Sequence, residues 1–556
     1  MKLADASRAW RRARAHVLPP VEHERVMAGS HMERHGRLTA LYLSGSPYEM
    51  GYQQGTLARD LIHGFRQAAY AYVTSQVPVP RVLARPMLFY YASAYRRTLE
   101  AEHAAEMQGI ADGAGVHLVE ALVSTAIWEI LLVSGCSEFA AVGPATADGT
   151  LLHGYNYDLM QPEHALIQPY LAMLLYNPHE GIPFFTVNTV GTVGANAGMN
   201  DAGISVAWDN TYLRDHHLVQ GVRLPVVPFI LTLRRLLQYA ATLGEAVDTI
   251  VRTLPRPLAD IVIVGSAREG RAVALETAGG VHAVREMEGD TIWSTNCFRS
   301  DELAPHDRRG DSRRLPESAA WVCVPRFTAY DQLLSAARGQ ITPATCARFL
   351  RDPYPREGEG FLHPNPAARA TICRSLTSWS LVMQPGLGRF WVSDTEVPGS
   401  QGRYYAFDLQ RKARLPEMDL PASGFHEALA AALRYREGDL PAAESALEGA
   451  QAADGPSAPL LLMRAVLKGL SGEEGEAAGI LRLVEARWAG TAAAALAQAW
   501  MGREADGGVS LPFPSAIRPL VRLRAAESWV GRAVACEPPA AGSTPPVEAC
   551  QSAERP

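Results

Sequence analysis

From about residue 37 to residue 415 the pattern of hydrophobic and polar positions shows short β-rich runs that alternate with helical ones. Where Gly, Asp or Asn bound such runs they predict strands, and the clearest are RLTALYLSG, DGTLLHGYNYD, PYLAMLLYN, IPFFTVNTVG, GISVAWDN, DIVIVGS, RAVALET and DTIWSTN. Residues 47–64, 86–113 and 118–132 have helical spacing instead. The pattern predicts an α/β or α+β domain in which a helical N-terminal portion precedes the strand-rich part.

The composition changes after Pro416, where Ala, Leu and Glu become common and strand signals almost disappear. Five positions match the second-helix pattern of a tetratricopeptide-type (TPR) repeat: Gly438, Asp439, Ala443, Leu447 and Ala450. The following helices match only loosely, so a small Ala-rich bundle remains an alternative. The expected organisation is an N-terminal extension (1–36), the strand-rich domain (37–415), an α-helical TPR-like region (416–536) and a Pro/Ala/Ser-rich tail (537–556) that is predicted to be disordered.

Composition limits the partners and the location. A chain of 556 residues with 47% hydrophobic and 20% charged residues indicates a soluble globular protein of more than one domain. The net charge of −6 and the absence of a basic block argue against nucleic acid. We expect no secretory signal, and the longest apolar run, ALVSTAIWEILLVSG, is too short to span a bilayer. Seven cysteines without a C-x-x-C pair argue against a disulfide framework, so a cytoplasmic location is expected.

The step Gly135-Cys136-Ser137 joins a helix-like run to a strand-like run. A glycine permits strained backbone geometry that leaves its carbonyl open to attack by the following thiol, so this bond could cleave itself. The new terminal α-amino group of Cys136, with a pKa of about 7.7 to 8.0, could then act as the base for its own thiol. The alternative is that Cys136 is a small core residue, the commoner fate of a lone cysteine.

Asp158 is a second candidate for the chemistry at Gly135-Cys136. The pair Asp148-Gly149 predicts a two-residue hairpin turn, so the strand that begins at Cys136 should pair with the strand that ends at Asp158. Counting outward from the turn puts Asp158 opposite about Phe139, within roughly 10 Å of Cys136, or less if a bulge intervenes. A carboxylate there could bind a newly formed ammonium.

The run GCSEFAAVGPATADGTLLHGYNYD, with the upstream LYLSGSPYEMGYQQG, resembles the acyl-coenzyme A:6-aminopenicillanate (isopenicillin-N) acyltransferase family of N-terminal nucleophile (Ntn) hydrolases. Choloylglycine hydrolases and acid ceramidase are more distant relatives. The resemblance covers residues 41–409 and includes GMNDAGISVAWDN, STNCFRSD and FWVSDTEVPGSQGRYYAFDL. It implies a four-layer αββα sandwich, self-cleavage between Gly135 and Cys136, and an acyl group that passes through a Cys136 thioester to water or an amine.

The resemblance also implies roles for single residues. Cys136 would be the nucleophile and Asp158 the partner of its amino group. The oxyanion hole would take a backbone N–H from Asn210 and the side-chain amide of Asn296, since a tetrahedral oxyanion needs neutral donors already aimed at it.

Three positions depart from the family pattern. Tyr155 stands where many relatives have Arg, and we expect it at the substrate. Cys297 follows Asn296 where the family often has His. The late Arg beside a Ser that the family predicts could be Arg313 or Arg314, next to Ser312, and Arg314 is carried forward as a substrate-binding candidate.

Other chemistries find little support. The sequence lacks G-x-x-x-x-G-K-[ST], G-x-S-x-G and H-E-x-x-H, and the adjacent His216 and His217 fit a loop better than a metal site. We expect no metal or organic cofactor, and a small amide or acyl thioester as substrate. Two alternatives stay open: a phospholipase B-like hydrolase of lipid amides or esters, and a non-catalytic scaffold that binds partners, or itself, through the C-terminal helices.

Overall fold

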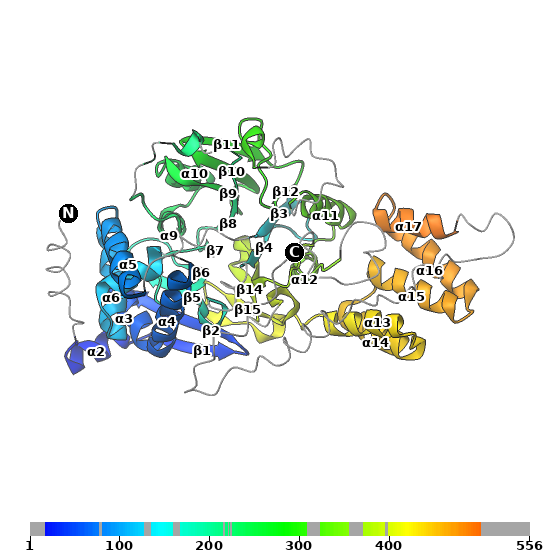
Figure 1. Ribbon diagram of the computed structural model, residues 1–556, viewed down its shortest axis with the longest axis horizontal. Coiled ribbons are helices and arrows are strands. Elements are labelled where there is room, and N and C mark those ends of the chain that lie inside the picture. The colour runs from blue at the N-terminus through cyan, green and yellow to red at the C-terminus, as the bar shows by residue number, and fades with distance from the viewer. Residues whose placement is uncertain are drawn as a thin grey trace.

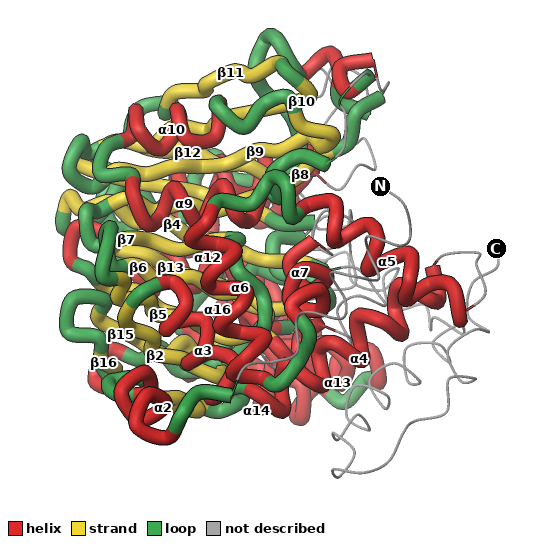
Figure 2. Tube along the Cα trace, turned by 90° about the vertical axis from the view of Figure 1, so that its left-hand side faces the viewer, coloured by secondary structure: helices red, strands yellow, loops and turns green. Residues whose placement is uncertain are grey.

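The computed structural model describes residues 17–76, 81–126, 135–159, 167–214, 217–220, 222, 225–308, 323–354, 371–394 and 398–501. Within them the chain is a mixed α+β protein with two large sheets (Figures 1 and 2). The nine-stranded sheet has the order β1 (His31–His35), β2 (Leu38–Gly45), β5 (Leu171–Pro178), β6 (Phe184–Thr189), β7 (Ala197–Asn200), β8 (Ile204–Thr211), β9 (Arg256–Ser266), β10 (Arg271–Gly279), β11 (Val281–Glu286). The seven-stranded sheet has the order β12 (Thr291–Ser294), β3 (Ser137–Gly143), β4 (Gly149–Asp158), β13 (Thr377–Gln384), β14 (Arg389–Ser393), β15 (Tyr404–Asp408), β16 (Ala413–Arg414).

Helices cover the outer face of each sheet. The N-terminal ones are α2 (Pro20–Met27), α3 (Pro47–Leu57), α4 (Arg59–Gln76), α5 (Arg81–Tyr95), α6 (Ala101–Ala114) and α7 (Leu118–Ala126). The predicted helices 47–64 and 86–113 are therefore each interrupted. Along the chain, α9 (Phe229–Tyr239) and α10 (Leu243–Val251) follow β8, and α11 (Cys323–Ala336) and α12 (Pro343–Leu350) follow β12.

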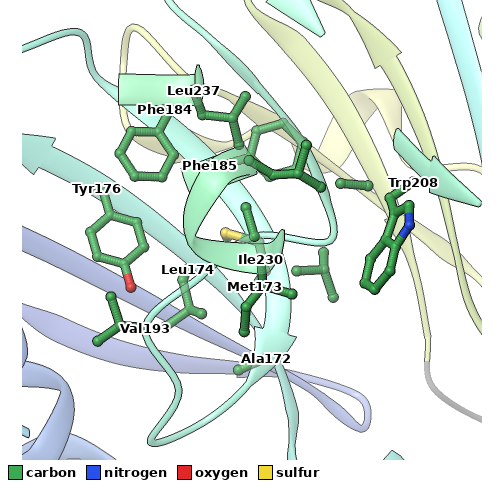
Figure 3. Close-up of a cluster of buried hydrophobic side chains, with 14 of the residues drawn as sticks. Ala172, Met173, Leu174, Tyr176, Phe184, Phe185, Val193, Trp208, Ile230 and Leu237 are labelled. Atoms are coloured by element: carbon green, nitrogen blue, oxygen red, sulfur yellow. The ribbon is translucent and has the colours of Figure 1, made fainter. Parts of the chain in front are cut away.

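The core has four layers. Between the sheets, Phe185 of β6 stacks on Phe390 of β14, with ring centroids 3.5 Å apart. The helices α3, α6, α9 and α10 share one buried cluster with the nine-stranded sheet, and Figure 3 shows the part around β5, β6 and α9. The helices α11 and α12 share another with the outer face of the seven-stranded sheet. Strands buried on both faces read as continuous apolar runs, as the segment LAMLLY of β5 does.

The N-terminal motif YEMGYQQG packs two helices closely. A Cβ atom at Gly51 of α3 would lie 2.0 Å from the carbonyl oxygen of Glu106 in α6. A Cβ atom at Gly109 of α6 would lie 2.1 Å from the carbonyl oxygen of Tyr48 in α3. The motif therefore serves helix packing: glycines let the two backbones touch where any other residue would clash.

The C-terminal helices form a separate cluster at the far end of the molecule from α3–α6 (Figure 1). They are α13 (Phe425–Glu437), α14 (Leu440–Asp454), α15 (Ala458–Leu470), α16 (Glu474–Arg487) and α17 (Ala492–Met501). Gly438 ends α13 in the left-handed conformation and Asp439 caps α14, whose Ala443, Leu447 and Ala450 are buried as the repeat spacing requires. A TPR-like architecture stays a prediction, and residues 502–556, with the predicted tail, lie outside the described residues.

Two predicted domain boundaries, at residues 36 and 415, lie next to strands and bridges that hydrogen bonds join across them. Strand β1 pairs with β2, so the nine-stranded sheet begins within the predicted N-terminal extension. At the other end Leu420 pairs with Tyr404, and the carbonyl oxygen of Pro421 accepts a hydrogen bond from Arg351. The strand-rich domain therefore extends past residue 415. Among the described residues no helix is long and apolar enough to cross a membrane.

Candidate active site

The hairpin of β3 and β4 brings Cys136 and Asp158 together, in a different register from the one predicted. Gly143 pairs with Gly149 after a bulge, so the turn holds residues 144–148 and not Asp148-Gly149 alone. The hydroxyl of Thr146 donates within this longer turn. Phe139 pairs with Gly154 rather than Asp158, and the Gly135 N–H donates to the Asp158 carbonyl oxygen over 3.2 Å. The shift brings the carboxylate nearer to the Gly135-Cys136 bond than predicted.

The thiol of Cys136 is fully buried beside Tyr155. The Tyr155 Oη lies 3.3 Å from the Cys136 Sγ and donates to the carbonyl oxygen of Trp208 over 2.7 Å. A phenol has one hydrogen, so when it bonds Trp208 its lone pairs can accept the S–H. Burial and then the carboxylates of Asp209 and Asp158 raise the pKa of the Cys136 thiol. The thiol is thus held in its protonated form, and it must lose that proton before it can act as a nucleophile.

Asp158 lies in a cationic setting. Its Oδ2 is 3.4 Å from Arg374 Nη1 and 4.0 Å from Arg326 Nη1, and its Oδ1 accepts from the Thr377 hydroxyl over 2.7 Å. Burial raises the pKa of this carboxyl, while Arg374 and Arg326 act in the opposite direction. This places the carboxylate beside the two guanidinium groups that face Gly135, in a strand paired with the one that follows Cys136.

Two guanidinium groups point at the carbonyl of Gly135. Arg326 Nη1 donates to it over 2.7 Å and Arg374 Nη1 over 3.3 Å. The same Arg326 nitrogen donates to the Cys136 carbonyl over 2.9 Å, and its Nη2 donates to Thr295 O and Asn296 Oδ1 over 3.1 and 2.6 Å. Burial lowers the pKa of Arg326 to about 10, which still leaves it charged at neutral pH. Negative charge developing on the Gly135 oxygen would therefore meet donors already in place.

Asn296 lies at the same centre, with an unusual backbone. Its φ of 68° is in the left-handed region, which non-glycine residues seldom occupy. Its Nδ2 donates to the Asn210 carbonyl oxygen over 2.6 Å and to Asp209 Oδ1. Both amide hydrogens are then engaged, so donation to an oxyanion requires one of these bonds to be exchanged.

The structure brings together Cys136, Asp158, Tyr155, Asn210 and Asn296, and their catalytic roles stay predictions. Ser312, Arg313, Arg314 and His216 lie outside the described residues. Sequence reasoning missed Arg326, Arg374 and Asp209. For Arg374 a signal existed, since Ser375 follows it and the family pattern calls for an Arg beside a Ser.

Cys297 and Cys323 form a disulfide, a pairing that the sequence analysis did not predict. It joins the residue after Asn296 to the first residue of α11, the helix that carries Arg326. Thr295 reinforces the link, because its hydroxyl donates to the Cys323 carbonyl over 2.7 Å. Disulfides are rare in cytosolic proteins, so this pair argues against the cytoplasmic location expected from the sequence.

No group of three or more His, Cys, Asp or Glu side chains within the described ranges is arranged to hold a metal ion. The chemistry available from these residues is that of a thiol, carboxylates, amides and guanidinium groups.

Several known proteins are similar over part of the chain. An uncharacterized protein of Archaeoglobus fulgidus is 29% identical over 280 residues, covering 45% of this chain and 45% of that protein. Protein dcd1B of Dictyostelium discoideum is 27% identical over 280 residues, covering 46% of this chain and 53% of that protein. The match thus spans about half the length of these relatives.

Two solved structures are more distant. A Caenorhabditis elegans ortholog of N-acylethanolamine-hydrolyzing acid amidase is 18% identical, with a TM-score of 0.33, and the match covers 49% of this chain and 99% of that chain. A mutant of the conjugated bile acid hydrolase from Clostridium perfringens is 13% identical, also with a TM-score of 0.33, covering 50% and 93%. Scores this low carry no argument about the fold.

A family model gives the most direct comparison. Residues 145–352 match the model described as acyl-coenzyme A:6-aminopenicillanic acid acyl-transferase. The matched segment contains Asp158, Asn210, Asn296 and Arg326, and it begins after Cys136. The match confirms the resemblance of the sequence motifs: residues 145–352 are similar to the acyl-coenzyme A:6-aminopenicillanic acid acyltransferase family.

Proposed function

We propose that this protein is a cysteine Ntn amidohydrolase or N-acyltransferase that activates itself by cleavage between Gly135 and Cys136. The observation that carries the proposal is the environment of the Gly135 carbonyl. Arg326 and Arg374 donate to its oxygen, the attacking thiol belongs to the next residue, and the Asp158 carboxylate lies 3.4 Å from the same Arg374 nitrogen. The family match over residues 145–352 and the four-layer arrangement of the core support the same activity.

Self-cleavage needs no outside reactant except water. The Cys136 sulfur attacks the Gly135 carbonyl carbon, and the oxyanion that forms is stabilised by Arg326 and Arg374. The C–N bond breaks, the α-amino nitrogen of Cys136 takes the proton that the thiol gives up, and Gly135 is left as a thioester on the sulfur. Water then hydrolyses the thioester, which yields a Gly135 carboxylate and a free thiol, while Asp158 holds the new ammonium.

The mature enzyme would repeat this chemistry on its substrate. The α-amino group of Cys136 takes the thiol proton, the sulfur attacks an amide or thioester carbonyl, and the leaving amine or thiol departs with a proton. Asn296 and the backbone N–H of Asn210 bind the oxyanion. The acyl group on Cys136 then passes to water or to an amine.

Intact-mass analysis tests the proposal at its first step. The purified wild type should contain residues 1–135 and 136–556 as separate chains, with the second beginning Cys-Ser-Glu-Phe. Cys136→Ala should stay intact and folded. Cys346→Ala is the matched control, since Cys346 is also a buried free thiol but lies on α12, and this variant should cleave normally. An intact wild type, or a cut at another bond, would refute the proposal and favour a non-catalytic scaffold.

A further inference from the structure

The end of strand β8 connects the nucleophile to Asn296. The Trp208 carbonyl oxygen accepts the hydrogen bond of Tyr155, whose oxygen contacts the Cys136 sulfur. Two residues further, the Asn210 carbonyl oxygen accepts from Asn296 Nδ2. Asp209 is the residue between them.

Asp209 binds Asn296 at two points. Its Oδ2 accepts from the Asn296 backbone N–H over 2.6 Å and from the Ser294 hydroxyl over 3.1 Å, and its Oδ1 accepts from Asn296 Nδ2. This carboxylate is fully buried. A non-glycine residue persists in the left-handed region only where its surroundings hold it there. The paired contacts from Asp209 account for the backbone conformation of Asn296.

The orientation of the Asn296 amide follows from its partners. Arg326 has donors only, so the amide atom that faces it must be the oxygen, and the NH₂ group must face Asp209 and Asn210. A carboxylate is a stronger acceptor than a neutral carbonyl. When an oxyanion forms, the Asn210 carbonyl is therefore the partner that Nδ2 releases, and Asp209 remains bound.

We propose that Asp209 is a positioning residue that holds Asn296 in its left-handed conformation and aims one amide hydrogen at the oxyanion. This inference rests on the proposed function. The charge of Asp209 has a matching cation in Arg326, which binds the other end of the same amide. Asn296 is thus fixed between an acceptor on β8 and a donor on α11, and its amide exchanges only the Asn210 bond as the transition state forms.

A double-mutant cycle tests whether Asp209 acts through Asn296. Asp209→Asn, Asn296→Ala and the double variant are each acylated at Cys136 with p-nitrophenyl acetate, per mole of cleaved chain. Burial raises the pKa of Asp209 to about 7, so the assay is run about one pH unit higher, where the carboxylate is mostly ionised. Asp209→Asn should slow maximal acylation about 10- to 100-fold, because the Asn296 amide no longer points at the oxyanion. The half-saturating concentration of p-nitrophenyl acetate should change less than about twofold, because substrate binding is unaffected. In the Asn296→Ala background the same change should slow acylation less than about twofold.

Asp260→Asn is the matched control. Asp260 is an equally buried carboxylate that pairs with Arg256 on the adjacent strand β9, and it does not bond Asn296. Its effect should be the same with and without Asn296. If Asp209→Asn fails to fold, Ser294→Ala serves instead, since it removes one donor to the same carboxylate and keeps the charge. Its smaller loss should also vanish in the Asn296→Ala background.

The outcomes separate the two proposals. A cleaved wild type in which Asp209→Asn is equally harmful in both backgrounds, or harmless in both, overturns the positioning role alone. A cleaved Asn296→Ala that is acylated at the wild-type rate overturns it too. A wild type that stays uncleaved, or whose Cys136 is never acylated, overturns the proposed function, and the inference falls with it.

Discussion

Replacing Arg326 by Lys should separate its two tasks. The guanidinium serves four acceptors in two pairs: Nη1 binds the carbonyl oxygens of Gly135 and Cys136, and Nη2 binds Thr295 O and Asn296 Oδ1. A lysine keeps the charge that faces Asp158, but it offers a single nitrogen in place of a planar fork. One nitrogen cannot replace both Nη1 and Nη2, so Arg326→Lys must lose at least one pair of contacts.

The size of the effect follows from which pair is lost. Without the Gly135 contact, self-cleavage loses its shorter oxyanion donor, which typically slows such a step about 10²- to 10³-fold, or roughly 2.7 to 4 kcal/mol. The remaining donor, Arg374 at 3.3 Å, is less well placed. Without the Asn296 contact, cleavage survives but the amide loses the partner of its oxygen, and turnover falls by about tenfold or more, or at least about 1.4 kcal/mol. Two lost hydrogen bonds to a charged group should also lower the free energy of unfolding by about 3 kcal/mol.

Both rates can be measured on one preparation. Chain made in a cell-free system is sampled over time and the cleaved fraction read on a denaturing gel, and acylation of Cys136 by p-nitrophenyl acetate is then measured per mole of cleaved chain. Arg351→Lys is the control: Arg351 also binds three backbone carbonyl oxygens, those of Ser400, Gly402 and Pro421, but away from Cys136. It should destabilise the fold and leave both rates within about threefold. If Arg326→Lys also keeps both rates within about threefold of wild type, the reasoning about its four contacts is wrong.

Three further predictions use other parts of the structure. Truncation after Ser423 should leave self-cleavage intact, whereas truncation after Leu415 should lower stability because it removes the pairing of residue 420 with β15. Denaturing gels measure cleavage and thermal melting measures stability for both truncated proteins. If the protein truncated after Ser423 is soluble but uncleaved, the C-terminal helices are needed for cleavage. Reducing the Cys297–Cys323 disulfide with a dithiol should lower the rate of Cys136 acylation, although Cys136 itself stays reduced. A Cys297→Ser variant cannot form the disulfide. If this variant is insensitive to the dithiol and as active as the oxidised wild type, the prediction is wrong. Burial lowers the pKa of His153 to about 3 from an ordinary value near 6.5, so the unfolded chain binds a proton there first. The contribution of His153 to the free energy of unfolding should therefore fall by about 1.4 kcal/mol per pH unit as the pH drops below about 6.5. His153→Asn should remove that contribution from the pH dependence measured in urea titrations, and an unchanged pH dependence would contradict it.

Local patterns predicted more of this molecule than long-range contacts did. The strands could be predicted because short apolar runs and the Gly, Asp and Asn residues that bound them are local signals. The eight runs quoted in the sequence analysis all fall on strands. The proximity of Cys136 and Asp158 was predicted because a hairpin joins them. Its register was wrong because Asp148-Gly149 is only the end of a turn that starts after Gly143.

The missed residues share a physical reason. Arg326 reaches Gly135 from α11, 191 positions later, and Arg374 reaches it 239 positions later. The disulfide likewise spans 26 positions and has no C-x-x-C spacing. Contacts of this kind depend on how the layers stack, which no periodicity within a single segment encodes.

The parallel pairing of β2 with β5 has a consequence for how the mature protein can be assembled. The pairs run from Thr39 with Ala172 to Gly45 with Pro178, so cleavage after Gly135 would place the two partners of this ladder on different chains. The first fragment would then be a permanent subunit of a heterodimer and not a removable propeptide. Made alone, the second fragment would expose β5 as an open edge, which invites self-association. Folding of the single chain must therefore precede cleavage, and the two subunits, once unfolded, should not reassemble efficiently when mixed.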